Sequence, residues 1–292
     1  MSIPFDFHST ETCLPAVRAL LFFSLAISSF QNLYNAPQYS NNGLLAWKFL
    51  KYAFQRKFFE SKTFDILYSN AGFITLNIAR IALVLVGAAS LALPEVLTAL
   101  FVIQLLLYIR AFLVTSAADQ LNTIILLFLL ICAWCPNPAI QTLSLCAMAI
   151  HTLFCYFANG LIKLQAHRWR DGSHLKSILL TENYSRKWLA RQIEKPRIAG
   201  VGVGAGPAGG VTSTSAGLRP FKYLSLTVII WEVSAILVPF LPEPLVWIFL
   251  AFGLCFHAVV GTVMGLNTFF WTFVSTYPAI IFLAFQIDKL VQ

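Results

Sequence analysis

Hydrophobic residues form long, almost uninterrupted runs along this chain of 292 residues, and short polar or proline-containing segments separate them. A transmembrane α-helix needs about 20 consecutive, mostly apolar residues to cross a bilayer. Runs that approach this length lie at residues 14–34, 71–93, 96–115, 121–136, 141–164, 223–241, 245–264 and 267–287. The pattern predicts an all-α, polytopic membrane helix bundle of about eight transmembrane helices, with a re-entrant segment as the alternative for the short fourth run.

The composition excludes an ordinary soluble protein. The chain is 58% hydrophobic and only 11% charged, whereas soluble domains are about 45–50% apolar and about 25% charged. A soluble protein with so few polar residues could not cover its surface, so the excess apolar area must face lipid. We expect residues 1–292 to form a single transmembrane domain, because the remaining length leaves no room for a second large soluble domain.

Two long loops interrupt the hydrophobic runs, at about residues 35–70 and 165–222. In the first, large apolar residues alternate with lysine and arginine over residues 44–59, which predicts an amphipathic helix lying in the headgroup region. The alternative is a helix that packs on the bundle. The second loop contains a Gly/Ser/Thr-rich tract at about 198–219, which is typical of a flexible linker.

That tract contains Gly204-x-Gly206-x-x-Gly209, which matches the spacing of a dinucleotide-binding turn. The spacing has meaning only between a strand and a helix of a βαβ unit. No such unit is predicted here, and Pro207 interrupts the turn. We therefore assign no cofactor to this tract. The residues by themselves do not identify a cofactor elsewhere in the chain.

The formal charge of +8 is concentrated in the two long loops, which hold about fifteen of the 20 Lys and Arg residues. With eight spans, both loops lie on one face and both termini on the other. The positive-inside rule makes the loop face cytoplasmic. The basic residues then contact anionic lipid, and the lipid bilayer is the expected partner rather than nucleic acid. We expect a multi-pass protein of a bacterial plasma membrane or an organellar membrane.

Ionisable side chains within the spans are the candidate chemistry, because charge at membrane depth is costly and is kept where it pairs, lines a cavity or reacts. The direction of each span places most of them in the loop-side half and Glu232 at mid-depth. The loop-side residues are Arg80, Arg110, Asp119, Lys163 and His257. Their shared depth predicts an internal polar site.

Each candidate also has a structural alternative. Lys163 is either a base activated by burial or a lysine that snorkels to the interface. Glu232 either relays protons or forms an ion pair with Arg80, Arg110 or Lys163. Asp119 either orients a catalytic neighbour or caps the fourth helix.

The spacing of small residues around His257 places it on a packed helix face. Gly253, His257, Gly261 and Gly265 recur every four residues, and glycine lets another backbone approach closely. His257 would shuttle a proton or hold a ligand there. The alternative is a histidine that is hydrogen-bonded at a helix interface.

Cys132-Ala-Trp-Cys135 has the spacing of a thiol–disulfide exchange motif. It ends the fourth span on the face opposite Lys163 and lacks the βαβ context that makes the motif specific. We favour packing or incidental thiols, and we expect no metal site.

Several short patches, taken together in order, resemble the vitamin K-dependent γ-carboxylase-like superfamily, also called the HTTM (horizontally transferred transmembrane) domain. The superfamily includes bacterial membrane proteins that mature a sporulation-delaying peptide toxin. The strongest patch is Tyr156-Phe-Ala-Asn-Gly-Leu-Ile-Lys163-Leu with Trp169-x-x-Gly172, and the others are Ala117-Ala-Asp119-Gln-Leu, Trp231-Glu232-Val-Ser-Ala, Phe256-His257, Met264-Gly-Leu and Phe269-Phe-Trp271.

The resemblance implies an HTTM-like domain in which Lys163 is the general base. It also implies a quinone or hydroquinone such as vitamin K, and a peptide substrate or a second membrane subunit as partner. We therefore expect a carboxylase-like membrane enzyme or maturation factor acting on a peptide or a quinone-like lipid. Lys163 would be the base, His257 and Glu232 would relay protons, and Asp119 would orient a neighbour. The alternative is a non-catalytic maturation or immunity partner of a secreted peptide.

Overall fold

The computed structural model describes residues 6–54, 61–180 and 215–291, and within these ranges it contains helices and no strands. Spans long and apolar enough to cross a membrane are Thr10–Tyr34 (α1), Asn70–Ala88 (α4), Leu93–Arg110 (α5), Ala117–Trp134 (α6), Pro138–Gln165 (α7), Leu218–Phe240 (within α11, Ser215–Ser234, and η5, Ala235–Phe240), Glu243–Met264 (α12) and Asn267–Val291 (α13, Asn267–Val274, and α14, Tyr277–Val291). These eight described spans make the chain an all-α, multi-pass integral membrane protein, as the hydrophobic pattern predicts.

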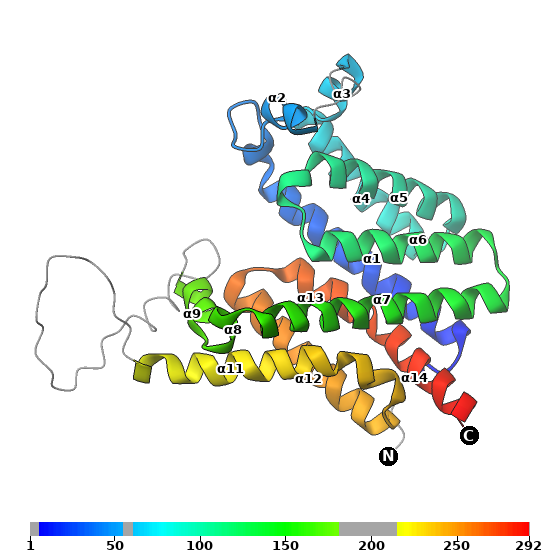
Figure 1. Cartoon of the computed structure of the whole chain (residues 1–292). Helices are drawn as coiled ribbons and strands as arrows, with labels where there is room; N and C mark the ends of the chain where they lie inside the picture. The colour runs from blue at the N-terminus through cyan, green and yellow to red at the C-terminus, as the bar shows by residue number, and fades with distance from the viewer. Residues whose placement is uncertain (1–5, 55–60, 181–214, 292) are drawn as a thin grey trace, which may run out of the picture.

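Consecutive spans run in opposite directions, so the bundle has two different ends (Figure 1). Both described termini and the short turns that follow α4, α6 and η5 lie at one end. The opposite end, which we call the loop end, carries the described residues 35–54, 61–69, 111–116 and 166–180 and the α12–α13 turn. The described parts of the two long loops therefore lie at one end of the bundle, as the span count predicts.

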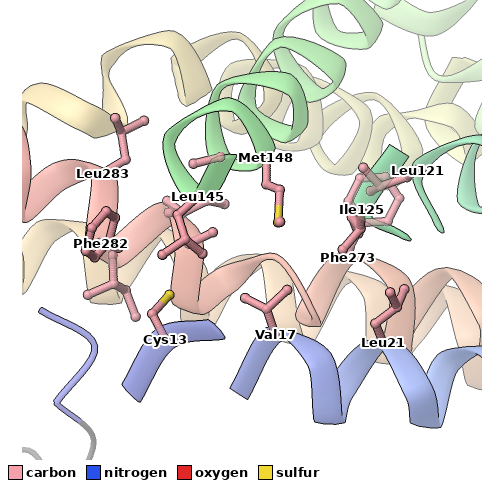
Figure 2. Close-up of a cluster of buried hydrophobic side chains, with 14 of the residues drawn as sticks. Cys13, Val17, Leu21, Leu121, Ile125, Leu145, Met148, Phe273, Phe282 and Leu283 are labelled. Atoms are coloured by element: carbon pink, nitrogen blue, oxygen red, sulfur yellow. The ribbon is translucent and has the colours of Figure 1, made fainter. Parts of the chain in front are cut away.

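The core of the bundle is formed by helix faces that repeat every four residues. Cys13, Val17 and Leu21 lie in a row along α1 and are fully buried (Figure 2). They face side chains of α7 and α14, among them Met148 and Phe282. Lipid tails are as apolar as these side chains, so close van der Waals packing holds the spans together.

The last predicted span, 267–287, is confirmed as the span Asn267–Val291, but it consists of two helices, because α13 ends at Val274 and α14 begins at Tyr277. Pro278 explains the break, since proline has no N–H to donate and its ring clashes with the carbonyl four residues earlier. Within the break, Ser275 Oγ donates to the Thr272 carbonyl at 2.6 Å and Thr276 Oγ1 to the Phe273 carbonyl at 2.7 Å. These hydroxyls satisfy backbone groups that lipid cannot.

The fourth span is a regular helix of 18 residues, α6, and not a re-entrant segment. Its start lies four residues earlier than the predicted 121. A capping box explains the earlier start, because Ser116 accepts from the backbone N–H of Asp119, and Asp119 accepts from that of Ser116.

The first long loop is only partly helical where the structure describes it. Instead of one amphipathic helix over 44–59, it has a four-residue helix, α2 (Trp47–Leu50), and a 3-10 turn, η2 (Lys51–Phe54). Residues 55–60 lie outside the described ranges. Trp47 and Leu50 are buried against Tyr68, so the described part packs on the bundle.

In the second long loop, His167–Arg170 (α8) and Ser173–Leu180 (α9) follow α7. Most of the predicted linker at 198–219, including the glycines at 204–209, lies outside the described residues. The predicted linker is wrong over its last part, because α11 already begins at Ser215. Packing of α8 and α9 on α11 stabilises these additional turns.

Arg110 fastens the first loop to the end of α5. Its guanidinium is fully buried and donates to the backbone carbonyls of Tyr68 at 2.9 Å, Leu45 at 2.9 Å and Tyr39 at 3.2 Å. The guanidinium also lies 4.9 Å from the Tyr39 ring centre. One cation thus binds three separate points of the same loop.

We expect Arg110→Met to destabilise the protein by about 3 kcal/mol, because three buried carbonyls would lose a charged donor. Thermal unfolding in detergent, combined with limited proteolysis of the first loop, measures this. Arg18→Met is the control, since Arg18 makes only a 3.5 Å contact with Ser90. Equal stability of the two variants would contradict the anchoring role of Arg110.

Candidate functional site

The centre of the candidate site is an ion pair between two spans. Lys163, in the last turn of α7, places Nζ 2.5 Å from Oε1 of Glu232 in α11. The side chains are 18% and 5% exposed, respectively, so the pair is largely removed from solvent. Of the three partners considered for Glu232, the structure selects Lys163.

Gly160 permits this pair by letting the two helices touch. A Cβ atom at Gly160 would lie 2.8 Å from the backbone nitrogen of Val233 and 2.9 Å from Cβ of Glu232. No larger residue fits there unless α7 and α11 move apart. Because Lys163 lies one turn beyond Gly160, the close approach brings its amine within reach of the carboxylate.

The Trp169-x-x-Gly172 segment covers the pair from the loop end. The Trp169 ring centre lies 5.0 Å from Lys163 Nζ, a cation–π distance. Ser225 of α11 donates to the Trp169 carbonyl at 2.6 Å. Gly172 adopts φ +79°, and a Cβ there would lie 2.3 Å from the backbone nitrogen of Lys222. Only glycine allows this turn to lie against α11.

Outside the spans, Asp171 stabilises the same turn. Its carboxylate accepts from the Ser173 backbone N–H at 2.8 Å, and this hydrogen bond lowers the pKa of Asp171. The negative charge therefore persists at neutral pH, close to the basic residues of α8.

His257 forms a second polar pair, with Tyr156 of α7. The Tyr156 hydroxyl and His257 Nε2 are 2.7 Å apart, and His257 is only 3% exposed. The imidazole stacks on Phe273 with ring centres 4.5 Å apart, and its Nδ1 has no hydrogen-bond partner among the described residues. Sequence reasoning gave Tyr156 no role, although its position seven residues before Lys163 puts both on one helix face.

The two pairs therefore lie along one strip of α7 that contains Tyr156, Gly160 and Lys163. Trp231 connects them, because it precedes Glu232 in α11 and its ring centre lies 4.9 Å from that of Tyr156. The structure thus places Glu232 of α11 and His257 of α12 against neighbouring turns of α7, beside Lys163 and Tyr156, respectively.

The glycines around His257 have different roles. At Gly253, a Cβ would lie 2.5 Å from the Tyr277 hydroxyl and 2.9 Å from the Trp231 ring, so this position requires glycine. At Gly261 the nearest atom would be at an ordinary 3.5 Å. Gly265, at φ +73°, is the residue at which α12 ends rather than a packing position.

Among the described residues, Asp119 forms no hydrogen bond with Lys163, Glu232 or His257. Its Oδ2 accepts from the backbone N–H of Ser116 at 2.9 Å and from its hydroxyl at 2.8 Å. Arg80, fully buried in α4, belongs to a different network. It donates to Ser29 at 2.6 Å and Gln104 at 2.7 Å.

Cys132 and Cys135 lie at the far end of α6, away from the loop end that holds Lys163. Both are thiols, the first buried and the second exposed. Within the described ranges, no three His, Cys, Asp or Glu side chains are grouped closely enough to hold a metal ion.

No protein-family model, curated protein or solved structure matches this chain. The resemblance to the HTTM superfamily therefore rests on the sequence patches alone and stays a prediction.

We expect Gly160→Ala to destabilise the protein by about 1–3 kcal/mol through overpacking and to separate Lys163 from Glu232. Gly261→Ala is a matched control, because this buried helical glycine has room for a methyl group and alanine favours the helix. Thermal unfolding of both variants in the same detergent measures the difference. If Gly160→Ala were as stable as Gly261→Ala, the close approach of α7 and α11 would be contradicted.

Proposed function

We propose that this protein is a membrane-embedded enzyme, or an enzyme-like maturation factor, that acts on a peptide or a quinone-like lipid with Lys163 as its base. The observation that carries the proposal is the short hydrogen bond between Lys163 and Glu232, in a setting largely removed from water. The sequence resemblance to carboxylase-like membrane proteins supports the same role for Lys163.

The proposed chemistry starts from the hydrogen bond of the pair. This bond joins a proton donor, Nζ, to an acceptor, Oε1, in a setting largely removed from water, and such a setting disfavours charged groups. Moving one proton along the bond from Nζ to Oε1 leaves Lys163 as a neutral amine. This amine can accept a proton from a substrate O–H or an acidic C–H, while Glu232 keeps the proton that it received.

The neighbouring groups suit a base of this kind. The face of Trp169 stabilises the ammonium that forms when Lys163 accepts a proton. Tyr156 and His257 form a second hydrogen bond along the same strip and supply a route by which a proton moves between groups. Asp119 acts at a distance, by fixing Ser116 and thereby the start of α6.

A second candidate is a non-catalytic membrane partner, such as a maturation or immunity factor for a secreted peptide. The same ion pair favours it, because a salt bridge between α7 and α11 also cross-links two spans. The two candidates differ in one requirement. A base must lose its proton, whereas a cross-link needs only its charge.

We expect Lys163→Arg to keep the fold but to lower proton abstraction at least tenfold, because arginine is not deprotonated in proteins. The assay uses the protein in lipid nanodiscs under anaerobic conditions, with a naphthohydroquinone as the probe. Ionisation of bound quinol to quinolate is followed by its ultraviolet absorbance. Lys163→Gln should abolish the signal as well.

Thermal unfolding of each variant separates loss of function from loss of fold. Quinolate formation by Lys163→Arg at the wild-type level would refute the base and favour the structural cross-link. Absence of quinolate with the wild-type protein would eliminate a quinol as the substrate.

A further inference from the structure

A large pocket with a mixed polar and apolar lining opens at the loop end of the bundle, separate from the Lys163 site. It has a volume of about 750 Å³ and lies between the end of α1, the 3-10 turn η1 (Ala36–Tyr39), the start of α6 and the α12–α13 turn. Polar side chains that line it are Ser28, Gln31, Asn32, Asn35, Gln38, Ser116, Asp119, Asn267 and Thr268. Neither Lys163, Glu232 nor His257 is among the lining residues.

Carboxamides supply much of the polar part of the lining. Each Asn or Gln offers both a donor and an acceptor, and several line this one pocket, whereas no Lys or Arg of the described residues does. Aromatic rings complete the wall, among them Tyr39, Phe269 and the exposed Phe30 and Tyr34 at the end of α1. A set of paired donors and acceptors with flat apolar faces suits a group that carries many hydroxyls and has apolar C–H faces.

The charge of the pocket also favours an uncharged ligand. Among the described residues that line the pocket, Asp119 supplies the only carboxylate, and Ser116 already donates twice to its Oδ2. The buried Arg80 interacts electrostatically with Asp119. An anionic ligand would find no lysine or arginine among these lining residues, and a cationic one would face a carboxylate that already accepts two hydrogen bonds.

One group in the wall remains available for a ligand, because Oδ1 of Asp119 accepts no hydrogen bond from residues 6–54, 61–180 and 215–291. Tyr39 also lines the pocket and lies outside the spans; burial raises the pKa of its phenol, which therefore stays a neutral hydroxyl. Carboxylate and carboxamide groups bind adjacent hydroxyls in pairs, because each presents two polar atoms side by side.

We infer that this pocket binds an uncharged, hydroxyl-rich group, namely a sugar or polyol, supplied either as a free solute or as the headgroup of a glycolipid. The pocket lies at the loop end, where the spans leave the apolar part of the membrane, so both sources can reach it. This inference is independent of the proposed function, because Lys163, Glu232 and His257 do not line the pocket.

The test compares three ligands with the protein in phosphatidylcholine nanodiscs. Free maltose represents the solute, monoglucosyldiacylglycerol the headgroup, and phosphatidylserine a charged lipid whose headgroup has no free hydroxyl. Binding is measured as an increase in the unfolding temperature, and native mass spectrometry detects retained lipid. We expect one or both sugar probes to bind and phosphatidylserine not to bind.

The variant Asn35→Leu/Gln38→Leu removes two carboxamides from the wall and should weaken sugar binding at least tenfold. Both side chains are exposed, so the unliganded variant should unfold at the wild-type temperature. Gln120→Leu is the matched control, because Gln120 is an exposed carboxamide near the pocket that does not line it. Lys163→Gln should bind the sugar probe as the wild type does, which separates this inference from the base.

The outcomes are decisive. Binding of maltose assigns a free solute, and binding of the glycolipid alone assigns a headgroup. Failure of both sugar probes to bind, or equal retention of phosphatidylserine, would overturn the inference. Undiminished sugar binding by Asn35→Leu/Gln38→Leu would also overturn it, because the sugar would then bind elsewhere.

Discussion

A charged group inside a membrane protein must find its partner within the protein, and the loop end of this bundle is built around that constraint. Lys163 and Glu232 satisfy each other across two spans, and this requires α7 and α11 to touch at Gly160. The same contact orders the Trp169–Gly172 turn on α11, because the turn packs on the helix that carries Glu232. A pair of opposite charges thus contributes to the arrangement of α7, the Trp169–Gly172 turn and α11.

The two buried arginines satisfy the constraint differently. Arg80 donates to hydroxyl and amide oxygens of α1, α5 and its own helix α4, and Arg110 donates to backbone carbonyls of a loop. No carboxylate of the described residues accepts a hydrogen bond from either guanidinium. Neutral oxygens in sufficient number can replace a counter-ion, since each accepts a charge-assisted hydrogen bond. The result is polar networks that hold α1, α4, α5 and the first loop together.

The spans could be predicted from the sequence because the length of a hydrophobic run is a local property. The sequence also contains a signal for the break before α14, because Pro278 interrupts helix hydrogen bonding. The hydrophobic run continues on both sides of this proline, so the run by itself predicts one unbroken span. The partner of Glu232 was not predictable, because Arg80, Arg110 and Lys163 had similar expected depths. Which of them meets Glu232 depends on which helices are neighbours, and that is decided by close packing at positions such as Gly160.

The hydrogen bonds of Arg110 have a consequence for the order in which the chain is assembled. Their acceptors lie 42 to 71 residues earlier in the sequence, at Tyr68, Leu45 and Tyr39. During synthesis the first loop leaves the ribosome well before the guanidinium that fastens it. Its carbonyls must remain hydrated until the third span has been inserted, so the segment reaches its native conformation only after that span is in the bilayer.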